Sequence, residues 1–382
     1  MTKTPHFDYL IIGSGLAGLQ LALKMAEDAF FRNKVVALID PQLKTSNDKT
    51  WSFWEKPSSQ WNSIVYKSWD HARVLTKNKQ TELNLFPYKY KTIRALDFYN
   101  TSKKTLHALP NFEFINETAT DISVIDNTPI LNTENNAYRA SHIFDSRLPT
   151  SFSYNAPKSI SIIQHFKGWV IQTPSPCFED NCITMMDYRL KDGAQTTFTY
   201  VLPFSKTKAL VEFTYFTSNL VQEETYDEFI QTYIKKYLNI ENFETIETEM
   251  GQIPMTTFPF ENFNSKHITK IGTGGGWVKG STGYSFKHTE KKVAKIIENL
   301  KGNKQPSDQI YSRKHKFYDK VFLKVLQDNN AKGEWIFQQF YSKNSPQTML
   351  RFLDEESSFY EELKIMWSLF SWSFIKAFFK TL

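Results

Sequence analysis

A glycine-rich segment near the N-terminus has the residue types and spacing of a nucleotide-binding turn. It follows an apolar run at residues 8–12 and reads Gly13-Ser14-Gly15-Leu16-Ala17-Gly18. Asp40 ends a second apolar run, which completes a β-α-β pattern. Glycines allow a tight turn and close approach of a pyrophosphate, and a carboxylate accepts hydrogen bonds from ribose hydroxyls. The pattern predicts a site for an adenosine with a free 2′-hydroxyl; a glycine-rich turn without a ligand is the alternative.

A second glycine cluster lies in the last third of the chain. It follows the apolar residues 268–271, precedes an amphipathic run, and contains Gly272, Thr273, Gly274, Gly275, Gly276, Trp277 and, further on, Gly283. Such clusters expose backbone at the end of a strand. Two of them indicate one long cofactor that is contacted twice, and FAD fits better than NAD because its flavin half needs a second helix end. A flexible loop is the alternative interpretation.

Glu212 is a residue in the middle of the chain that could transfer a proton. It lies between Val211 and Phe213 in an alternating segment that predicts a strand. If Glu212 faced the interior, burial would raise its pKa, and the neutral acid could donate a proton or its carboxylate could accept one. Alternation alone favours the other outcome, an exposed carboxylate on the polar face of a half-buried strand.

The elements needed to position these residues indicate a nucleotide domain interrupted by a second domain. Residues 8–40 predict β-α-β, residues 150–260 alternate as antiparallel strands do, with a helix near 226–237, and the tail from about 308 is helical. We therefore expect an α/β chain with an FAD-binding, Rossmann-like domain, an antiparallel substrate domain and a helical C-terminal region. Their expected ranges are 1–45 with 90–150 and 265–305, then 46–89 with 150–264, and finally 306–382.

Composition restricts the class of protein. The net charge of +6 comes from 46 basic and 40 acidic residues that are interleaved along the chain, so nucleic acid is not an expected partner. Cys177 and Cys182 are the two cysteines, and no spacing of histidine and cysteine predicts a metal site. The chain has neither a signal-peptide pattern nor an apolar run of about 20 residues. A cytoplasmic protein is expected, and its oligomeric state stays open.

Several further segments occur in order along the chain. They are Asp48-x-Thr50-Trp51-Ser52-Phe53, Gln164-x-Phe166-x-Gly168-Trp169, Met186-Asp187, Tyr200-Val201-Leu202-Pro203, Val211-Glu212-Phe213-Thr214, Gly251-Gln252-Ile253-Pro254 and Leu350-Arg351-Phe352-Leu353. Together with both glycine clusters, this series resembles the bacterial, single-chain lycopene β-cyclases over residues 7–355. One departure is Gly280-Ser281, where many members of that family carry Pro-Thr.

The resemblance implies a fold of the p-hydroxybenzoate hydroxylase and geranylgeranyl reductase type. It also implies cyclisation of the ψ-ends of lycopene to β-ionone rings, giving γ-carotene and β-carotene through a carbocation. Reduced FAD would be the cofactor, NAD(P)H its reductant, and Glu212 the acid, the base or both. Two alternatives remain: an FAD- and NAD(P)H-dependent monooxygenase or prenyl reductase acting on a lipophilic isoprenoid, and a non-enzymatic isoprenoid-binding protein.

Residues beside these motifs are candidates for the substrate pocket. The aromatic rings of Trp51, Phe53 and Trp277 could line an apolar tunnel and hold a cation, although core packing is the other interpretation. Asp187 and Thr214 are polar candidates, and Asp187 could instead pair with Arg189 on the surface.

The C-terminal segment at residues 365–379 combines tryptophan, phenylalanine and flanking lysines. This composition suits a helix at a membrane interface, and a helix that caps the substrate domain is the alternative. We expect peripheral membrane contact, because a C40 hydrocarbon must come from lipid.

Overall fold

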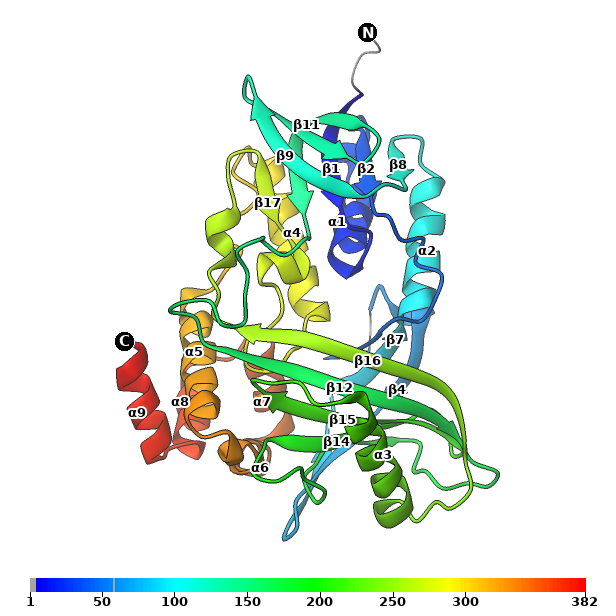
Figure 1. Cartoon of the computed structure of the whole chain (residues 1–382), viewed down its shortest axis with the longest axis vertical. Helices are drawn as coiled ribbons and strands as arrows, with labels where there is room; N and C mark the ends of the chain where they lie inside the picture. Colours follow the sequence, from blue (N-terminus) through cyan, green and yellow to red (C-terminus); the bar gives the residue numbers. More distant parts are fainter. Residues whose placement is uncertain (1–4, 58) are drawn as a thin grey trace.

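The computed structural model describes residues 5–57 and 59–382. Figure 1 shows an upper part built on one sheet, a lower part built on a second sheet, and C-terminal helices beside the lower part. A small sheet of three strands, in the order β3-β7-β4, is the third sheet. Its strands are β3 (Thr50–Glu55), β4 (Val65–Trp69) and β7 (Lys89–Arg94).

The upper sheet has seven strands in the order β8-β2-β1-β11-β10-β9, and β17 pairs with the end of β11. β8, β2, β1, β11 and β17 run parallel, whereas β9 and β10 are antiparallel. The strands are β1 (His6–Ile12), β2 (Val36–Ile39), β8 (Phe112–Ile115), β9 (Ala119–Ile125), β10 (Thr128–Thr133), β11 (Ala137–Asp145) and β17 (Ile268–Lys270). All four residues of β2 are buried, as expected for a parallel strand covered on both faces.

Three helices belong to this upper part. They are α1 (Leu16–Glu27), α2 (Ala95–His107) and α4 (Phe286–Lys301), and α1 packs against the other two. Leu19, Leu21 and Met25 of α1 are fully buried in this contact. In the sequence, β17 and α4 follow the strands of the second sheet, but they pack in the upper part. The upper part is therefore built from segments that precede and follow the lower part in the sequence. The exact domain ranges stay a prediction.

The lower sheet also has seven strands, in the order β16-β12-β15-β14-β13-β5-β6. They are β5 (His71–Leu75), β6 (Gln80–Asn84), β12 (Ser161–Gln172), β13 (Cys182–Asp187), β14 (Thr197–Pro203), β15 (Lys208–Thr217) and β16 (Glu244–Thr256). Helix α3 (Glu223–Tyr237) covers one face at β12 and β15. Val211 and Phe213 of β15 pack on the α3 side, and Leu210 and Phe216 pack on the opposite side with the C-terminal helices.

The C-terminal region is helical, as the sequence predicts. It comprises α5 (Arg313–Asp328), α6 (Gly333–Lys343), α7 (Pro346–Leu353), α8 (Phe359–Ser368) and α9 (Trp372–Thr381). Local sequence determines where some of these helices begin. Ser345 caps α7 ahead of Pro346, and Ser358 with Glu361 forms a capping box on α8. Short 3-10 turns at Ala29–Phe31, Asn62–Ile64, Phe260–Phe263, Gly272–Gly275 and Asn330–Lys332 complete the elements.

Candidate active site

A cavity of about 410 Å³ joins the two glycine segments to the lower sheet. At its upper end it is lined by Gly15, Leu16, Ala17 and Gly18 at the start of α1, and by Gly272 of the second cluster. The lower end is lined by residues of β12, β13, β14, β15 and β16 and by α6. The structure thus brings both glycine segments and Glu212 to one cavity.

Each of the three positions in the first segment is occupied by glycine for a different geometric reason. Gly13 has φ +97°, and a Cβ there would lie 2.2 Å from Ser146 Oγ. A Cβ on Gly18 would lie 2.0 Å from the carbonyl oxygen of Gly13, so helix and turn touch through bare backbone. Gly15 has no atom within 4 Å of such a Cβ among the described residues, so its backbone borders open space.

Asp40 lies beside this turn at the end of β2. Its Oδ2 accepts hydrogen bonds from the Ser14 backbone N–H at 2.8 Å and from the Ser14 hydroxyl at 3.1 Å. Helix α1 carries no acid in its first turn, and no side chain in the described part of the protein caps its N-terminus. Free N–H groups beside bare glycine backbone suit a pyrophosphate.

The second glycine segment packs directly onto the first. A Cβ on Gly272, which has φ +59°, would lie 3.0 Å from the Cβ of Ala17. Gly272 and Gly283 line the cavity, whereas Gly274 and Gly275 of the same loop do not. A Cβ on these two would meet the Arg147 and Lys270 carbonyl oxygens at 2.2 and 2.5 Å. Gly274 and Gly275 thus let the loop sit close against its neighbours, and the contact with a cofactor that the sequence predicts for them stays a prediction.

Two buried polar atoms at this end test whether the residues present fit a flavin. Gln164 Oε1 and Thr282 Oγ1 belong to residues that line the cavity, and neither has a hydrogen-bond partner among the described residues. Buried polar atoms are normally paired. An acceptor and a hydroxyl beside two glycine loops therefore fit the polar edge of a flavin ring.

Glu212, on β15, also lines the cavity. Its side chain is 8% exposed, so the exposed position favoured by alternation alone is wrong. The reason is that β15 is covered on both faces, by α3 and by the C-terminal helices. Burial, and then the nearby Glu249 carboxylate, raise the pKa of Glu212 to about 8, although a hydrogen bond from the Thr214 hydroxyl at 2.7 Å opposes this shift.

A cluster of three tyrosine hydroxyls lines the same cavity. Tyr90 Oη lies 2.7 Å from Tyr200 Oη and 3.1 Å from Tyr284 Oη. Burial raises the pKa of all three well above the ordinary tyrosine value, so they stay neutral. Tyr200 was quoted from the sequence only within a family segment, and none of the three tyrosines was given a site role, because their meeting depends on β7, β14 and the loop before α4.

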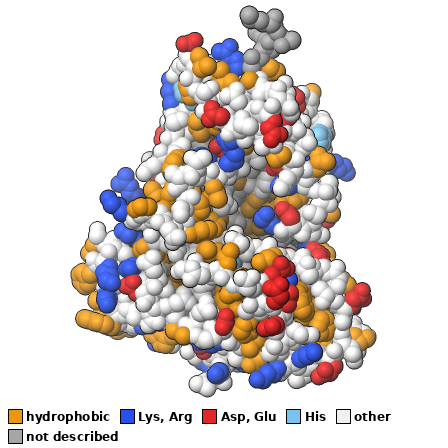
Figure 2. Space-filling model, in the orientation of Figure 1, with side chains coloured by type: hydrophobic (Ala, Val, Ile, Leu, Met, Phe, Trp, Pro, Cys, Tyr) orange, Lys and Arg blue, Asp and Glu red, His pale blue; other side chains and the backbone are white. Residues whose placement is uncertain are grey.

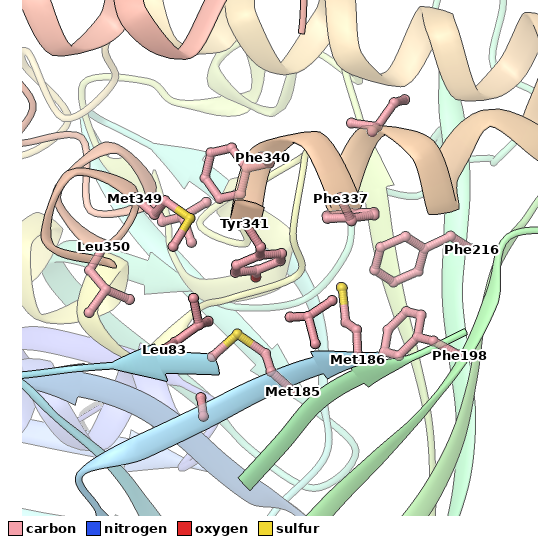
Figure 3. Packing of buried hydrophobic residues seen from close by; sticks show 14 of the residues in the cluster. Leu83, Met185, Met186, Phe198, Phe216, Phe337, Phe340, Tyr341, Met349 and Leu350 are labelled. Atoms are coloured by element: carbon pink, nitrogen blue, oxygen red, sulfur yellow. The ribbon is translucent and has the colours of Figure 1, made fainter. Parts of the chain in front are cut away.

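The apolar half of the cavity lies between α6 and the lower sheet. Figure 3 shows Phe337 and Tyr341 of α6 facing Met185 and Met186 of β13, with Phe216 beside them. These five residues all line the cavity. Met186 was quoted from the sequence only within the segment Met186-Asp187, and none of the five was assigned to the pocket, since nothing local distinguishes them from other core residues.

Candidate pocket residues named from sequence have different positions. Trp51 and Trp277 line the cavity. Phe53 does not; it stacks on Phe286 at 4.4 Å between ring centroids, inside the upper core. Thr214 is not among the lining residues either, and its hydroxyl donates a hydrogen bond to Glu212.

Asp187 does not line the cavity either, which corrects the expectation of a pocket role. It is fully buried on the α3 side, where its Oδ2 accepts hydrogen bonds from Tyr233 Oη at 2.7 Å and Arg189 at 2.6 Å. The ion pair with Arg189, which was the alternative, is present but holds a buried carboxylate. The contact with Tyr233, 46 residues further along the chain, left no local signal in the sequence.

Comparison with solved structures finds this fold among flavoproteins. A geranylgeranyl bacteriochlorophyll reductase-like protein from Thermoplasma acidophilum superposes with a TM-score of 0.65 at 12% identity, covering 99% of this chain and 100% of that one. A flavoprotein/dehydrogenase from Cytophaga hutchinsonii gives 0.61 at 12% identity with 92% of each chain covered. A flavin-dependent brominase gives 0.58 at 11%, covering 92% of this chain and 98% of that one. The predicted fold class, an FAD-binding Rossmann-like α/β fold of the geranylgeranyl reductase type, is confirmed.

Sequence comparison adds the family. No curated protein sequence matches this chain. The family model described as "Lycopene cyclase protein" matches residues 8–378, nearly the whole chain. The match covers the glycine segments, the strand that carries Glu212 and the C-terminal helices. With this coverage, and with a buried acid facing an apolar cavity, the chain belongs to the lycopene cyclase family.

Proposed function

We propose that this protein is a lycopene β-cyclase, which closes the ψ-ends of lycopene to β-ionone rings and yields γ-carotene and β-carotene. The observation that carries the proposal is Glu212, a buried acid with a raised pKa in an aromatic and apolar cavity. An intramolecular cyclisation needs such an acid, because its first step is protonation of an alkene.

The proposed cofactor is FAD in its reduced form, with NAD(P)H as the reductant. The segment 13–18 and Asp40 would hold the adenosine and pyrophosphate, and Gly272, Gly283, Gln164 and Thr282 would hold the flavin ring. Bound there, reduced FAD would supply an electron-rich ring that favours positive charge in the cavity.

The reaction conserves every atom of the substrate. Glu212, protonated at neutral pH, donates its proton to the terminal double bond of a ψ-end, which leaves a tertiary carbocation. The next double bond attacks this cation, forms the ring C–C bond and moves the charge into the ring. The ring carbon that formed the new C–C bond, which is next to the cationic carbon, then loses its proton, and the β-ring alkene forms. One proton enters and one leaves, and no electrons are exchanged.

The cavity wall suits a cationic intermediate. The faces of Trp51, Trp277 and the three clustered tyrosines can each stabilise a nearby cation by about 0.5–2 kcal/mol. The apolar side chains between α6 and β13 would receive the polyene chain and keep water away. Water exclusion matters because a hydroxide or water molecule would trap the cation.

Product analysis tests this proposal. Lycopene-accumulating bacteria that express the wild-type chain should contain β-carotene or γ-carotene, and Glu212→Gln should lower the yield by about 10²–10⁴-fold. A prenyl reductase or monooxygenase, which the fold also allows, would consume NAD(P)H in proportion to product. Unchanged lycopene beside folded, flavin-loaded protein would overturn the cyclase proposal.

We further propose that the enzyme is cytoplasmic and binds a membrane surface through α8 and α9. No helix among the described residues is long and apolar enough to cross a bilayer. The two helices and their connection expose large apolar side chains, namely Phe359, Tyr360, Leu363, Met366, Trp367, Phe370, Trp372, Phe378 and Phe379. Figure 2 shows such side chains next to lysines at the lower left, where Figure 1 places α9. Exposed Lys364, Lys376 and Lys380 would meet anionic headgroups.

Vesicle flotation tests this surface. Trp367 and Trp372 are each 77% exposed, and replacing both by serine should weaken binding to vesicles with anionic lipid by about tenfold or more. Leu43→Ser, at a side chain that is 64% exposed in the upper part, is the matched control and should bind as the wild type does. Equal flotation of all three proteins would contradict this surface.

A further inference from the structure

Glu212 has a partner two strands away. Gly168 of β12 is paired with Glu212 on β15 and with Glu249 on β16, so the three residues form one row across the sheet. Directly paired residues of neighbouring strands point to the same face. Both glutamates therefore point to the cavity face, and both line the cavity.

The glycine between them leaves room for the two side chains. A Cβ at Gly168 would lie 3.3 Å from Glu212 Cβ and 3.4 Å from Glu249 Cγ. The side chains of both acids thus occupy the space above the glycine. A larger residue at this place would keep them apart.

Each carboxyl group is oriented by one threonine hydroxyl. Thr214 Oγ1 donates to Glu212 Oε1 and Thr50 Oγ1 donates to Glu249 Oε2, both at 2.7 Å. Thr50 belongs to β3, so a third sheet contributes to the arrangement. One oxygen of each carboxyl is held, and the other is left for proton exchange.

The surroundings do not neutralise this pair. Glu249 is 9% exposed, and burial raises its pKa, against the Thr50 hydrogen bond and the more distant charge of Arg94. Arg94 itself is bound to Glu247 on the same strand. Tyr200 and Tyr284 face Glu212 as neutral hydroxyls. Two carboxyls that lie in one row of the sheet and interact electrostatically in a buried site tend to share one proton, because charging both is unfavourable.

We propose that Glu249 is a second catalytic carboxyl group: Glu212 gives the proton that starts ring closure, and Glu249 takes the proton that the ring releases. This rests on the proposed cyclase function. The cycle closes when the proton on Glu249 passes to the Glu212 carboxylate across Gly168. Atoms balance, because each glutamate loses and gains one proton per ring, and no external base is needed. A second ring can then be formed with the pair in its starting state.

The test compares Glu249→Gln with the wild type and with Glu244→Gln, a matched control at an exposed acid of the same strand. Glu249→Gln should lower the cyclisation rate about 10²–10⁴-fold while flavin absorbance and the circular dichroism spectrum stay unchanged. Glu244→Gln should keep the wild-type rate. The wild-type rate should be bell-shaped against pH, since one carboxyl must be protonated and the other ionised.

Thr50→Val provides a second route if Glu249→Gln does not fold. Loss of this hydroxyl removes a hydrogen bond that favours the Glu249 carboxylate, so the acidic limb of the pH–rate profile should move to higher pH. An unmoved limb, or a Glu249→Gln enzyme with the wild-type rate and profile, overturns the role of Glu249. If the wild type itself makes no cyclic carotenoid, the proposed function fails instead, and the two failures are distinguishable.

Discussion

The two faces of the lower sheet bury acids in opposite ways. On the α3 face, the Asp187 carboxylate accepts hydrogen bonds from Arg189 and Tyr233. On the cavity face, the polar contact of the Glu212 carboxylate within the described chain is the Thr214 hydroxyl, and a second acid lies nearby. A buried carboxylate with a cation serves the fold, whereas one without a cation keeps a proton available for chemistry.

His165 extends this comparison on the α3 face. Its two ring nitrogens contact Tyr226 and Thr217, and burial lowers its pKa to about 4, so it stays neutral. Every polar atom of that ring is used by the fold. Burial of a titratable side chain is therefore not by itself a sign of function.

The largest contrast is expected from Glu212→Gln, which should lower cyclisation by about 10²–10⁴-fold and stabilise the protein at alkaline pH. In the wild type the folded pKa of about 8 lies above the ordinary value, so the folded state binds more protons than the unfolded state between these values. Wild-type stability should fall as the pH rises from about 5 to 8, because burial of the charged form is unfavourable. The variant should lack this fall in a calorimetric series of melting temperatures. The same pH dependence of the melting temperature in both proteins would contradict the raised pKa of Glu212.

Asp187→Asn should lower the stability of the protein and leave its activity intact, the opposite of what we expect from Glu212→Gln. Loss of the carboxylate leaves Arg189 and Tyr233 without their shared partner, at a cost of about 2–4 kcal/mol; Arg189 is partly exposed, which keeps the cost below that of a fully buried pair. Cyclisation per folded molecule should be retained. Urea unfolding and product analysis of the same preparation measure both. A normal stability with lost activity would reverse the assignment of the two faces.

Gly168→Ala examines the cavity face without removing an acid. The added methyl group would lie 2.9 Å from Leu210 Cδ1 and 3.3 Å from Glu212 Cβ, so side chains must move. We expect a destabilisation of about 1–3 kcal/mol and a roughly tenfold loss of rate. Denaturant unfolding and initial rates measure these effects. A fully active, fully stable variant would show that the glycine is not required between the two glutamates.

Thr214→Val should have the smallest effect. The Thr214 hydroxyl favours the charged form of Glu212, so its loss raises the pKa of that residue further. The alkaline limb of the pH–rate profile, which reports loss of the catalytic proton, should therefore move to higher pH with the maximal rate nearly kept. A shift to lower pH would contradict the hydrogen-bond geometry.

The sequence was sufficient for features that depend on local pattern. The first β-α-β unit, the two glycine turns and the helical tail each carry their signal in neighbouring residues. The position of Glu212 required the family resemblance, because a strand covered on both faces does not alternate.

Glu249 could not be found in this way. It lies in a strand that also carries exposed Glu244 and partly exposed Glu247, so the local pattern indicates a solvated edge. Its meeting with Glu212 depends on the register of three strands and on a glycine in the middle one. Register of this kind is a long-range property. The position of Asp187 depends in the same way on α3.

The pairing of β17 with the end of β11 affects how the upper sheet can form while the chain is being translated. Asp145 of β11 lies beside Lys270 of β17, and the strands of the lower sheet from β12 onward are translated between them. At about 5–20 residues per second, the ribosome needs roughly 6–25 s for this stretch. A nascent chain thus presents an upper sheet without β17 until the strands of the lower sheet have been synthesised.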